Sequence, residues 1–502
     1  MRPGFNDHVF GARIKHDLSG RLSRAVSWRW VARPSATARA ARRPVQCELV
    51  QDPRPDQAAD PHETGAFDDS GAIWVGQIEL ADTLRADAVV EPDRASAHWA
   101  RVLVRLHHEP LGFVTVPSPS GALDIDLLRS TIWRSFKADI WRHLSEDGLP
   151  RPYDLPLEGL GGWDVCATEV LSPDPSEIPV SIVVGTRDRP GELRRVLRTL
   201  QQVEYGAFEV LVVDNAPSSD ATRECVEEFT ATDPRIRYLV EARAGLSRAR
   251  NAGLAAALYD WVAFTDDDVI VDPWWLRGVG RGIRRGAEVG CVTGFVPPAS
   301  LVEPAQRYFD ERFSWTDSLV PRVYDLDKRQ GDNALYPYLA GIFGTGANCA
   351  VDRRLVERIG GFDTALGAGT PTAGGEDLDM FLRVLLAGRA IAYEPSAVIW
   401  HVHRSGSEAL VRQVYGYGLG LTAYLAKHIL DPSTRWQVLK RLPISVWRLA
   451  HLLYRARRAQ PSVPQSTANA GYRHAELRGM IAGPLAYWRS RRSERTLQGS
   501  TR

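Results

Sequence analysis

A doubly wound α/β domain with a mostly parallel sheet is the fold class that this 502-residue chain predicts. Two observations lead to it. Between residues 180 and 265, four short apolar runs typical of buried strands alternate with three amphipathic helical patterns, and parallel strands need such helical crossovers. Polar groups follow these strands, at the edge where sheets of this kind bind ligands. A small α+β module precedes the domain and a helical region follows it.

The expected elements of this domain follow one another closely. Strands are predicted at residues 180–185, 208–213, 236–239 and 261–265, and helices from Pro190, at 220–229 and at 245–258. Because the carboxyl ends of parallel strands meet at one edge, Thr186, Asp214 and the residues after 265 should lie along the same rim.

The regions outside this alternation differ in composition. Residues 1–70, basic and then acidic, are expected to be a disordered leader and linker, although a transit peptide would look similar. Residues 71–150 predict the small α+β module, with strands at 73–80, 102–106 and 113–116, a turn at 109–112 and a helix from 124 towards 144. In this module, His107 and His108 are expected to be packing or surface groups. A linker (151–179), the doubly wound domain (180–405) and the helical region (406–502) follow.

Composition excludes several classes of protein. The net charge of +1 argues against nucleic-acid binding through a basic surface. The five cysteines are spread out and form no CxxC pair, so they indicate neither a zinc site nor a disulfide framework, and a reducing setting fits them. No run approaches the roughly 20 apolar residues of a membrane-spanning helix. We therefore expect a cytoplasmic protein, with any membrane contact peripheral and at the inner face.

Three consecutive aspartates, Asp266, Asp267 and Asp268, follow the last of the predicted strands. Clustered carboxylates repel one another, which makes sense at a buried strand end if a hard cation such as Mg²⁺ or Mn²⁺ sits there with substrate phosphates. A solvated acidic turn is the alternative.

Seven short motifs follow one another along the chain: Thr186-Arg187-Asp188-Arg189-Pro190, Val212-Val213-Asp214-Asn215, Ala249-Arg250-Asn251-Ala252-Gly253, Phe264-Thr265-Asp266-Asp267-Asp268, Gly344-Thr345-Gly346-Ala347-Asn348, Gly360-Gly361-Phe362-Asp363 and Gly374-Gly375-Glu376-Asp377-Leu378-Asp379. In sequence and order they resemble the motifs of glycosyltransferase family 2 enzymes, which have the GT-A fold. The resemblance covers about residues 180–405. It implies an inverting transferase that moves a sugar from a nucleotide-sugar, with a UDP-sugar favoured, to a hydroxyl acceptor.

The resemblance also implies roles on the donor side. Asp214 would accept a hydrogen bond from a uracil-type ring N–H, with Thr186 lining the same pocket. Arg250 would reach the donor phosphates or Asp266; an exposed arginine is the alternative. Asp266 would contact the ribose or the ion and Asp268 would bind the ion, because residues i and i+2 share a face of an extended backbone. Asp267 would then point away.

On the acceptor side, the resemblance assigns the catalytic base to Asp377, with Glu376 as the runner-up. Carboxylates in a first helical turn are also favoured by the helix dipole, so a structural role alone could explain them. His401 and His403 lie on one face of a predicted strand. Some family members use a histidine here as a third metal ligand, and His401 is preferred because it follows Trp400 as in that pattern; packing against Trp400 is the alternative.

The partners implied are a nucleotide-sugar and a glycan, lipid or other hydroxyl acceptor, which is compatible with cell-envelope or glycolipid synthesis. Residues 433–458 hold seven basic residues and no acids, interleaved with apolar ones, as in a helix lying on an anionic membrane. A docking helix with a solvated basic face fits equally well. A non-catalytic nucleotide-sugar scaffold on the same fold is the alternative function. A nicotinamide-dependent oxidoreductase is disfavoured, because no GxGxxG follows the first strand.

Overall fold

The computed structural model describes residues 72–90, 97–166, 178–313, 319–327, 334–403, 406–441, 443–444 and 467–500. The predicted leader at residues 1–70 and most of the basic segment at 433–458 lie outside these residues.

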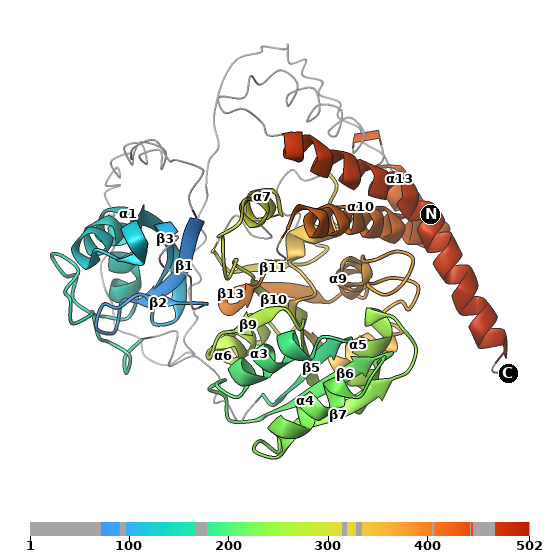
Figure 1. Cartoon of the computed structure of the whole chain (residues 1–502), viewed down its shortest axis with the longest axis horizontal. Coiled ribbons are helices and arrows are strands. Elements are labelled where there is room, and N and C mark those ends of the chain that lie inside the picture. The colour runs from blue at the N-terminus through green and yellow to red at the C-terminus, as the bar shows by residue number, and fades with distance from the viewer. Residues whose placement is uncertain are drawn as a thin grey trace, which may run out of the picture. The chain divides into compact units, whose positions relative to one another are not determined.

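One large sheet forms the centre of the domain that begins near residue 180 (Figure 1). Its strands, within the described residues, are β5 (Val180–Thr186), β6 (Phe208–Asn215), β7 (Ile236–Glu241), β8 (Trp261–Thr265), β9 (Val269–Val271), β10 (Val289–Phe295), β11 (Arg322–Tyr324), β12 (Asn348–Asp352) and β13 (Ala390–His401). The order is β11-β13-β10-β12-β8-β5-β6-β7, and β9 pairs with β13.

The sheet is mostly parallel, as the sequence predicts. The pairs β5–β6, β5–β8, β6–β7 and β10–β13 are parallel, whereas β12 is antiparallel to both β8 and β10, and β9 and β11 are antiparallel to β13. Thus β5, β6, β7, β8, β10 and β13 share one direction. The carboxyl ends of four of these strands, β5, β6, β8 and β13, carry the predicted site residues Thr186, Asp214, Asp266 and His401.

Two helical layers cover the sheet. On one face, α3 (Pro190–Leu200), α4 (Ala221–Thr230) and α6 (Trp275–Ile283) bury their apolar sides in one core. On the other face, α5 (Leu246–Ala256), α8 (Arg353–Arg358) and α9 (Glu376–Leu386) pack in a second core. Burial on both faces explains why the strands are continuous apolar runs rather than alternating ones.

The N-terminal module is a four-stranded sheet with a helix on it. Its strands β1 (Ala72–Glu79), β2 (Asp87–Ala88), β3 (Ala97–Leu106) and β4 (Glu109–Pro117) lie in the order β2-β1-β3-β4, and α1 (Ile125–Glu146) packs against them. The tight turn is at His107 and His108, with φ of 50° and 63°, and not at residues 109–112 as expected. Pro110 misled the prediction, because proline is tolerated in an edge strand such as β4.

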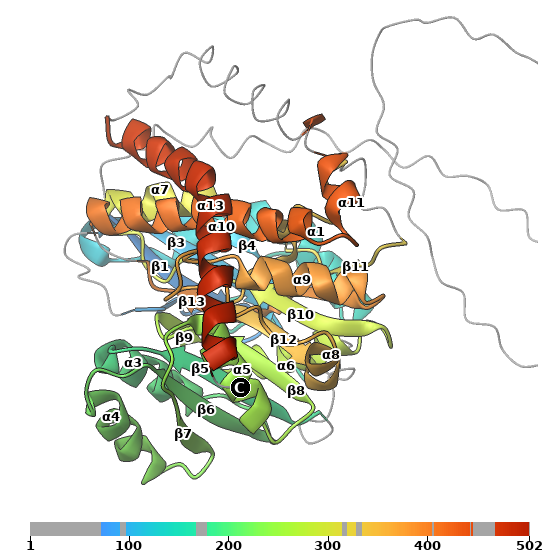
Figure 2. The same cartoon turned by 90° about the vertical axis from the view of Figure 1, so that its right-hand side faces the viewer.

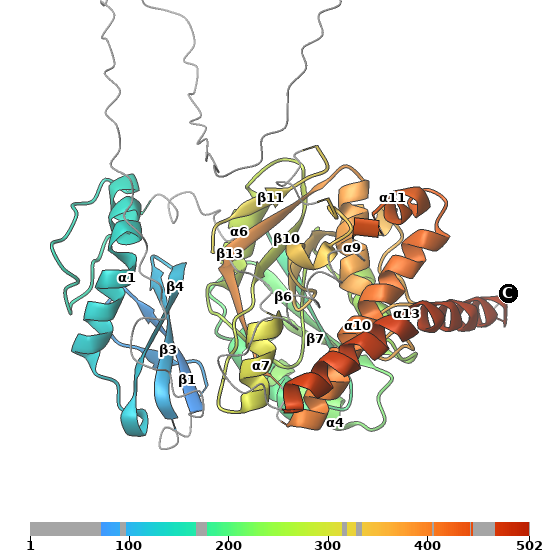
Figure 3. The same ribbon diagram turned by 90° about the horizontal axis from the view of Figure 1, so that it is seen from above.

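The C-terminal region is helical, as predicted. It contains α10 (Ser407–Leu430), α11 (Arg435–Leu439) and α13 (Thr467–Ser500). In Figure 2, α10 lies beside α9 and α13 crosses over α10. The backbones of α10 and α13 approach closely: a Cβ at Gly479 would lie 2.1 Å from the Tyr415 carbonyl oxygen. The helix α7 (Pro304–Phe313) packs against both, as Figure 3 shows, through a cluster that includes Phe309, Val414 and Tyr472.

None of the helices in the described ranges has both the length and the apolar character needed to cross a membrane. The predicted fold class, an α/β domain with a small α+β module before it and a helical region after it, is confirmed.

Candidate active site

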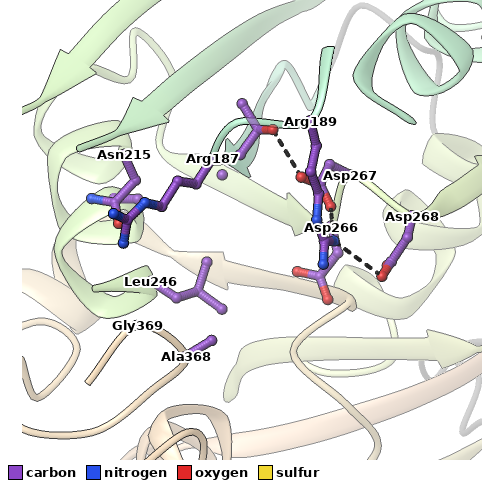
Figure 4. A pocket seen from close by; sticks show the side chains of 12 residues that line it. Arg187, Arg189, Asn215, Leu246, Asp266, Asp267, Asp268, Ala368 and Gly369 are labelled. Carbon is purple, nitrogen blue, oxygen red and sulfur yellow. Dashed lines mark hydrogen bonds and ion pairs between the residues drawn. The ribbon is translucent and has the colours of Figure 1, made fainter. Parts of the chain in front are cut away.

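The carboxyl ends of β5, β6 and β8 meet at one edge of the sheet. The parallel register pairs Thr186 with Asp214 and Val184 with Thr265, which brings the residues after each strand to the same level. A cavity of about 300 Å³ opens there (Figure 4). Its walls are Gly185, Thr186, Arg187, Arg189, Asn215, Leu246, Ala249, Asp266, Asp267, Asp268, Ala368 and Gly369. We call it the donor cavity, after the ligand that the sequence analysis expects on this side.

All three aspartates line the donor cavity. Asp267 does not point away as expected: its carboxylate accepts a hydrogen bond from Thr186 Oγ1 at 2.8 Å and pairs with Arg189 at 3.0 Å. The reason is that β8 ends at Thr265 and the chain turns at 267–268 before β9, so the alternation of an extended strand no longer applies. Burial and the neighbouring Asp268 raise the pKa of Asp267 to about 6.

A histidine faces the last aspartate of the triplet. His401 ends β13, which pairs with β9, and its Nε2 lies 3.5 Å from Asp268 Oδ1. On the other side of the ring, His401 Nδ1 lies 2.9 Å from His403 Nδ1. Burial and His401 lower the pKa of His403 to about 3, so His403 is neutral. The other ring nitrogen of His401, Nε2, faces Asp268.

Arg250 is buried and forms ion pairs with two carboxylates, Asp266 and Glu376. Its guanidinium lies 3.3 Å from Asp266 Oδ1 and 3.1 Å from Glu376 Oε1, and it donates to the Gly346 carbonyl at 3.1 Å. Burial opposes the charge, but Glu376 and Asp266 hold the pKa of Arg250 above its usual value. Its contact with Asp266 matches one of the two roles that the sequence predicts, and an exposed arginine is excluded.

A second cavity, of about 400 Å³, lies beyond Asp266. We call it the acceptor cavity. Asp266, Leu246 and Ala368 line both cavities. Its other walls come from the loop at 344–347, the first turn of α9, and helices α10 and α13. Gly375 precedes α9 with φ of 89°, and a Cβ there would lie 2.5 Å from the Gly420 carbonyl oxygen of α10, so only glycine fits.

Glu376 and Asp377 both line the acceptor cavity but differ in their contacts. Asp377 is half-buried, and its Oδ2 accepts from the Gly346 backbone N–H at 2.9 Å. Glu376 is buried and is held by Arg250. Burial and the Asp377 charge raise the pKa of Glu376. Of the two carboxylates, Asp377 is the one that is partly open and not tied to a cation.

The donor-side predictions for Thr186 and Asp214 have different outcomes. Thr186 lines the donor cavity. Asp214 is fully buried, is absent from the walls of that cavity, and accepts a 2.7 Å hydrogen bond from the Tyr238 hydroxyl. The side chain at this strand end that does line the cavity is Asn215.

The sequence reasoning overlooked several side chains of the two cavities. Arg187 and Arg189 lie in the first of the seven motifs, between the end of a strand and the start of a helix. Basic residues in that position indicate an anion-binding site, so the sequence could have predicted them. On the acceptor side it missed Arg312, Tyr417 and Glu476, which line the cavity from α7, α10 and α13. Their only local signal is a helical pattern, so the sequence alone could not place them.

Comparisons with known proteins find glycosyltransferases that are similar to this chain in sequence. Residues 181–360 match the family model described as Glycosyl transferase family 2. A pre-mycofactocin glycosyltransferase of Mycobacterium tuberculosis is 27% identical over 260 residues, which is 51% of this chain and 49% of that protein. Polypeptide N-acetylgalactosaminyltransferase 13 of Rattus norvegicus is 26% identical over 295 residues, covering 54% of this chain and 49% of that protein.

The matched stretch therefore spans about half the length of these relatives. Among solved structures, a mannosyltransferase from Pyrobaculum calidifontis in complex with GDP-Man and Mn²⁺ is similar with a TM-score of 0.41 and 16% sequence identity. That similarity covers 71% of this chain and 97% of the mannosyltransferase.

Proposed function

We propose that this chain, which carries a glycosyltransferase family 2 domain over residues 181–360, is an inverting, metal-dependent glycosyltransferase acting from a nucleotide-sugar to a hydroxyl acceptor. The observation that carries the proposal is the position of Asp266. It lies between a cavity lined by three aspartates and two arginines and a cavity lined by Asp377. A sugar held at Asp266 would face a diphosphate site on one side and a base on the other.

The residues that would hold the divalent ion are Asp268 and His401, with Asp266 beside them. They fit Mg²⁺ or Mn²⁺, because Asp268 Oδ1 and His401 Nε2 lie 3.5 Å apart, a separation that one ion can bridge. When bound, the ion supplies positive charge next to the departing diphosphate. His403 would orient His401 through the 2.9 Å contact between their Nδ1 atoms, as the outer partner of a metal-binding histidine does.

The donor diphosphate would lie along Arg187 and Arg189. Arg189 is one-third exposed and bridges Asp267 and Asp268, at 3.0 Å and 3.6 Å, so it can turn towards an incoming anion. A uracil base remains our preferred base. Asp214 could accept its ring N–H at Oδ1, because the Tyr238 hydroxyl is bound at Oδ2.

The proton of the acceptor hydroxyl would pass to Asp377. The hydroxyl oxygen attacks the anomeric carbon, the bond from that carbon to the diphosphate oxygen breaks, and the configuration is inverted because attack comes from the opposite face. The Gly346 N–H fixes Asp377 Oδ2 at 2.9 Å, and Oδ1, which accepts from the Leu378 N–H at 2.8 Å, would use its second lone pair for the acceptor. Glu376 would act through Arg250, by keeping that guanidinium next to Asp266.

We also propose peripheral contact with an anionic membrane, which would give access to a lipid-linked or envelope acceptor. Support comes from α13, where Ile481, Leu485 and Trp488 follow helical spacing and are 82%, 50% and 52% exposed. The exposed Arg478, Arg492 and Arg495 continue the same face. Part of the basic segment at 433–441 instead docks on the domain: Arg441 donates to the Tyr336 carbonyl at 3.2 Å, although Trp436 next to it is 67% exposed.

The experiment that tests the proposed activity is a screen of the purified chain for slow hydrolysis of UDP-, GDP- and dTDP-sugars with Mn²⁺ or Mg²⁺. We expect release of the nucleoside diphosphate from one class of donor, and none with excess EDTA. Binding of a nucleotide-sugar without hydrolysis or transfer under any condition would favour the non-catalytic scaffold instead.

A further inference from the structure

Four side chains with metal-binding atoms meet inside the N-terminal module, away from both cavities. They are His107 from the β3–β4 turn, His143 from the last turn of α1, Asp147 just after α1, and Cys166 from the segment that follows. His107 and Cys166 are 0% exposed and His143 is 7% exposed, and the Asp147 side chain is 3% exposed. Among the described residues, this is the one group of three or more histidine, cysteine and acidic side chains with converging ligand atoms that is identified as able to hold a metal ion.

The ligand atoms are spaced as around one small ion. His107 Nδ1 lies 2.9 Å from His143 Nε2 and 3.4 Å from Asp147 Oδ2. His143 Nε2 lies 3.2 Å from Asp147 Oδ2 and 3.6 Å from Cys166 Sγ. All four atoms lie within 4.8 Å of one another. Tetrahedral coordination with bonds of about 2.0–2.3 Å places ligand atoms roughly 3.3–3.7 Å apart, so small shifts suffice.

In both imidazoles, the ring nitrogen that points away from the cluster already contacts an oxygen acceptor. His107 Nε2 lies 2.7 Å from the Gly161 carbonyl oxygen, and His143 Nδ1 lies 3.3 Å from Glu109 Oε2. Both outer positions face acceptors, so the inner nitrogens are turned towards each other, 2.9 Å apart and beside the Asp147 carboxylate, where one cation can contact both. Carbonyl or carboxylate partners behind metal-binding histidines are the usual arrangement.

We propose that these four residues form a structural zinc site. Imidazole, thiolate and carboxylate together suit Zn²⁺ better than Mg²⁺ or Ca²⁺, which prefer oxygen ligands. Four protein ligands close the coordination sphere, so the site has a structural and not a catalytic character. On binding, the Cys166 thiol loses its proton to solvent and the sulfur becomes the fourth ligand.

The site would also steady the face of the module that meets the catalytic domain. His108, next to His107 in the turn, stacks on Trp274 with ring centroids 3.9 Å apart. Glu109, which orients His143, lies 3.7 Å from Arg281 of α6, and Arg105 pairs with Asp272 at 2.5 Å. An ion that joins the turn, the end of α1 and the segment after it fixes the geometry of these contacts.

The test uses the full chain, purified without chelator. We expect about one zinc per chain by elemental analysis, retained on dialysis, in the wild type and in the control His98→Ala, which changes an exposed histidine of β3. His143→Ala and Cys166→Ala should each lose most of this zinc. Equal zinc in Cys166→Ala and in the wild type would overturn the proposal.

A second measurement tests the site first in the wild-type chain. The wild-type chain, stripped of metal and titrated with Co²⁺, should develop tetrahedral d–d bands and a thiolate-to-cobalt charge-transfer band at one equivalent. Cys166→Ala should lack the charge-transfer band. No such band in the wild type, or the same band in Cys166→Ala, would contradict the assignment, and the second result would point to another cysteine such as Cys349, which lies near the acceptor cavity.

Discussion

Arg250 holds the carboxylates of both cavities in place. Because it is 3% exposed and lies 3.3 Å from Asp266 and 3.1 Å from Glu376, neither carboxylate can move without leaving a buried charge uncompensated. The residue next to Glu376 is free of this constraint. Asp377 accepts hydrogen bonds from the backbone N–H groups of Gly346 and Leu378, which suits the role of base that we propose for it.

Substitution of the two neighbouring carboxylates separates a base from a supporting residue. Asp377→Asn keeps the shape but cannot take a proton, so we expect transfer to fall by about a hundredfold or more with donor affinity nearly unchanged. Glu376→Gln should weaken donor binding as well, because it loosens Arg250. Steady-state kinetics with donor titration measure both. If Asp377→Asn keeps most of its rate and Glu376→Gln does not, the base is Glu376.

Metal binding should depend on pH through Asp267. Its pKa of about 6 is above the ordinary carboxyl value, so this group favours the folded protein as the pH falls below 6 and opposes folding above it. A divalent ion binds the charged triplet and relieves the repulsion. We expect the rise in melting temperature on adding Mn²⁺ to be larger at about pH 7.5 than at about pH 5. An equal rise at both, measured by scanning calorimetry, would contradict an ion at these aspartates.

Among the elements, α9 and α10 are joined through a buried ion network that explains the third acid of the Glu376-Asp377-Leu378-Asp379 run. Asp379 is fully buried and lies 2.8 Å from Lys427 Nζ, 3.0 Å from His428 Nε2 and 2.7 Å from Arg383 Nε. Burial acts in the opposite direction, but Lys427 and Arg383 lower the pKa of Asp379 well below its usual range. Its role is to fix the helix that presents Asp377.

Removal of this carboxylate should destabilise the domain. Asp379→Ala leaves Lys427 and His428 without their shared partner, and we expect a loss of about 3–5 kcal/mol in the free energy of unfolding. The folded pKa is depressed, so this contribution is present above the unfolded pKa and is lost as the pH falls below it. The difference in melting temperature from the wild type should therefore shrink below about pH 4. Asp139→Asn, on the surface of α1, is the control and should melt as the wild type does.

The exposed face of α13 should control membrane association. The double change Ile481→Ser, Trp488→Ser removes apolar area without disturbing Tyr487, which packs inward. We expect the wild type to sediment with liposomes containing anionic lipid at low salt and to be released at high salt, and the double variant to remain in solution. Leu258→Ser, which changes a residue 63% exposed in the catalytic domain, is the matched control.

This variant is a cleaner probe than truncation at residue 429. Such a truncation would remove α13 and expose α10, whose Tyr417 lines the acceptor cavity together with Glu476 of α13. If neither the wild type nor the double variant sediments at low salt, membrane association through α13 is contradicted. The role of α13 would then be limited to lining the acceptor cavity.

At the scale of the whole molecule, the sequence predicted what local patterns can report. The alternation of strands and helices from Val180 to Thr265 follows from apolar periodicity, and the parallel rule then brings Thr186 and Asp266 to one edge. Motif order was sufficient to predict the family whose model matches residues 181–360.

Long-range contacts were beyond that reasoning. The inward position of Asp267 depends on a turn after β8, and the roof of the acceptor cavity depends on α13 packing across α10. The histidine and cysteine cluster of the module joins residues from 107 to 166 that no short motif connects. The one part of this cluster that the local sequence could indicate is the pair His143 and Asp147, because residues four apart at a helix end lie on the same face.

The central claim, that this chain transfers a sugar with the help of an ion held at the aspartate triplet, is tested most directly by release of nucleoside diphosphate from its preferred nucleotide-sugar. We predict release by the wild type with Mn²⁺ or Mg²⁺, and none by Asp268→Ala or by the wild type in excess EDTA, because Asp268 and His401 together would hold the ion. Full release by Asp268→Ala, or by the wild type in EDTA, would contradict the claim.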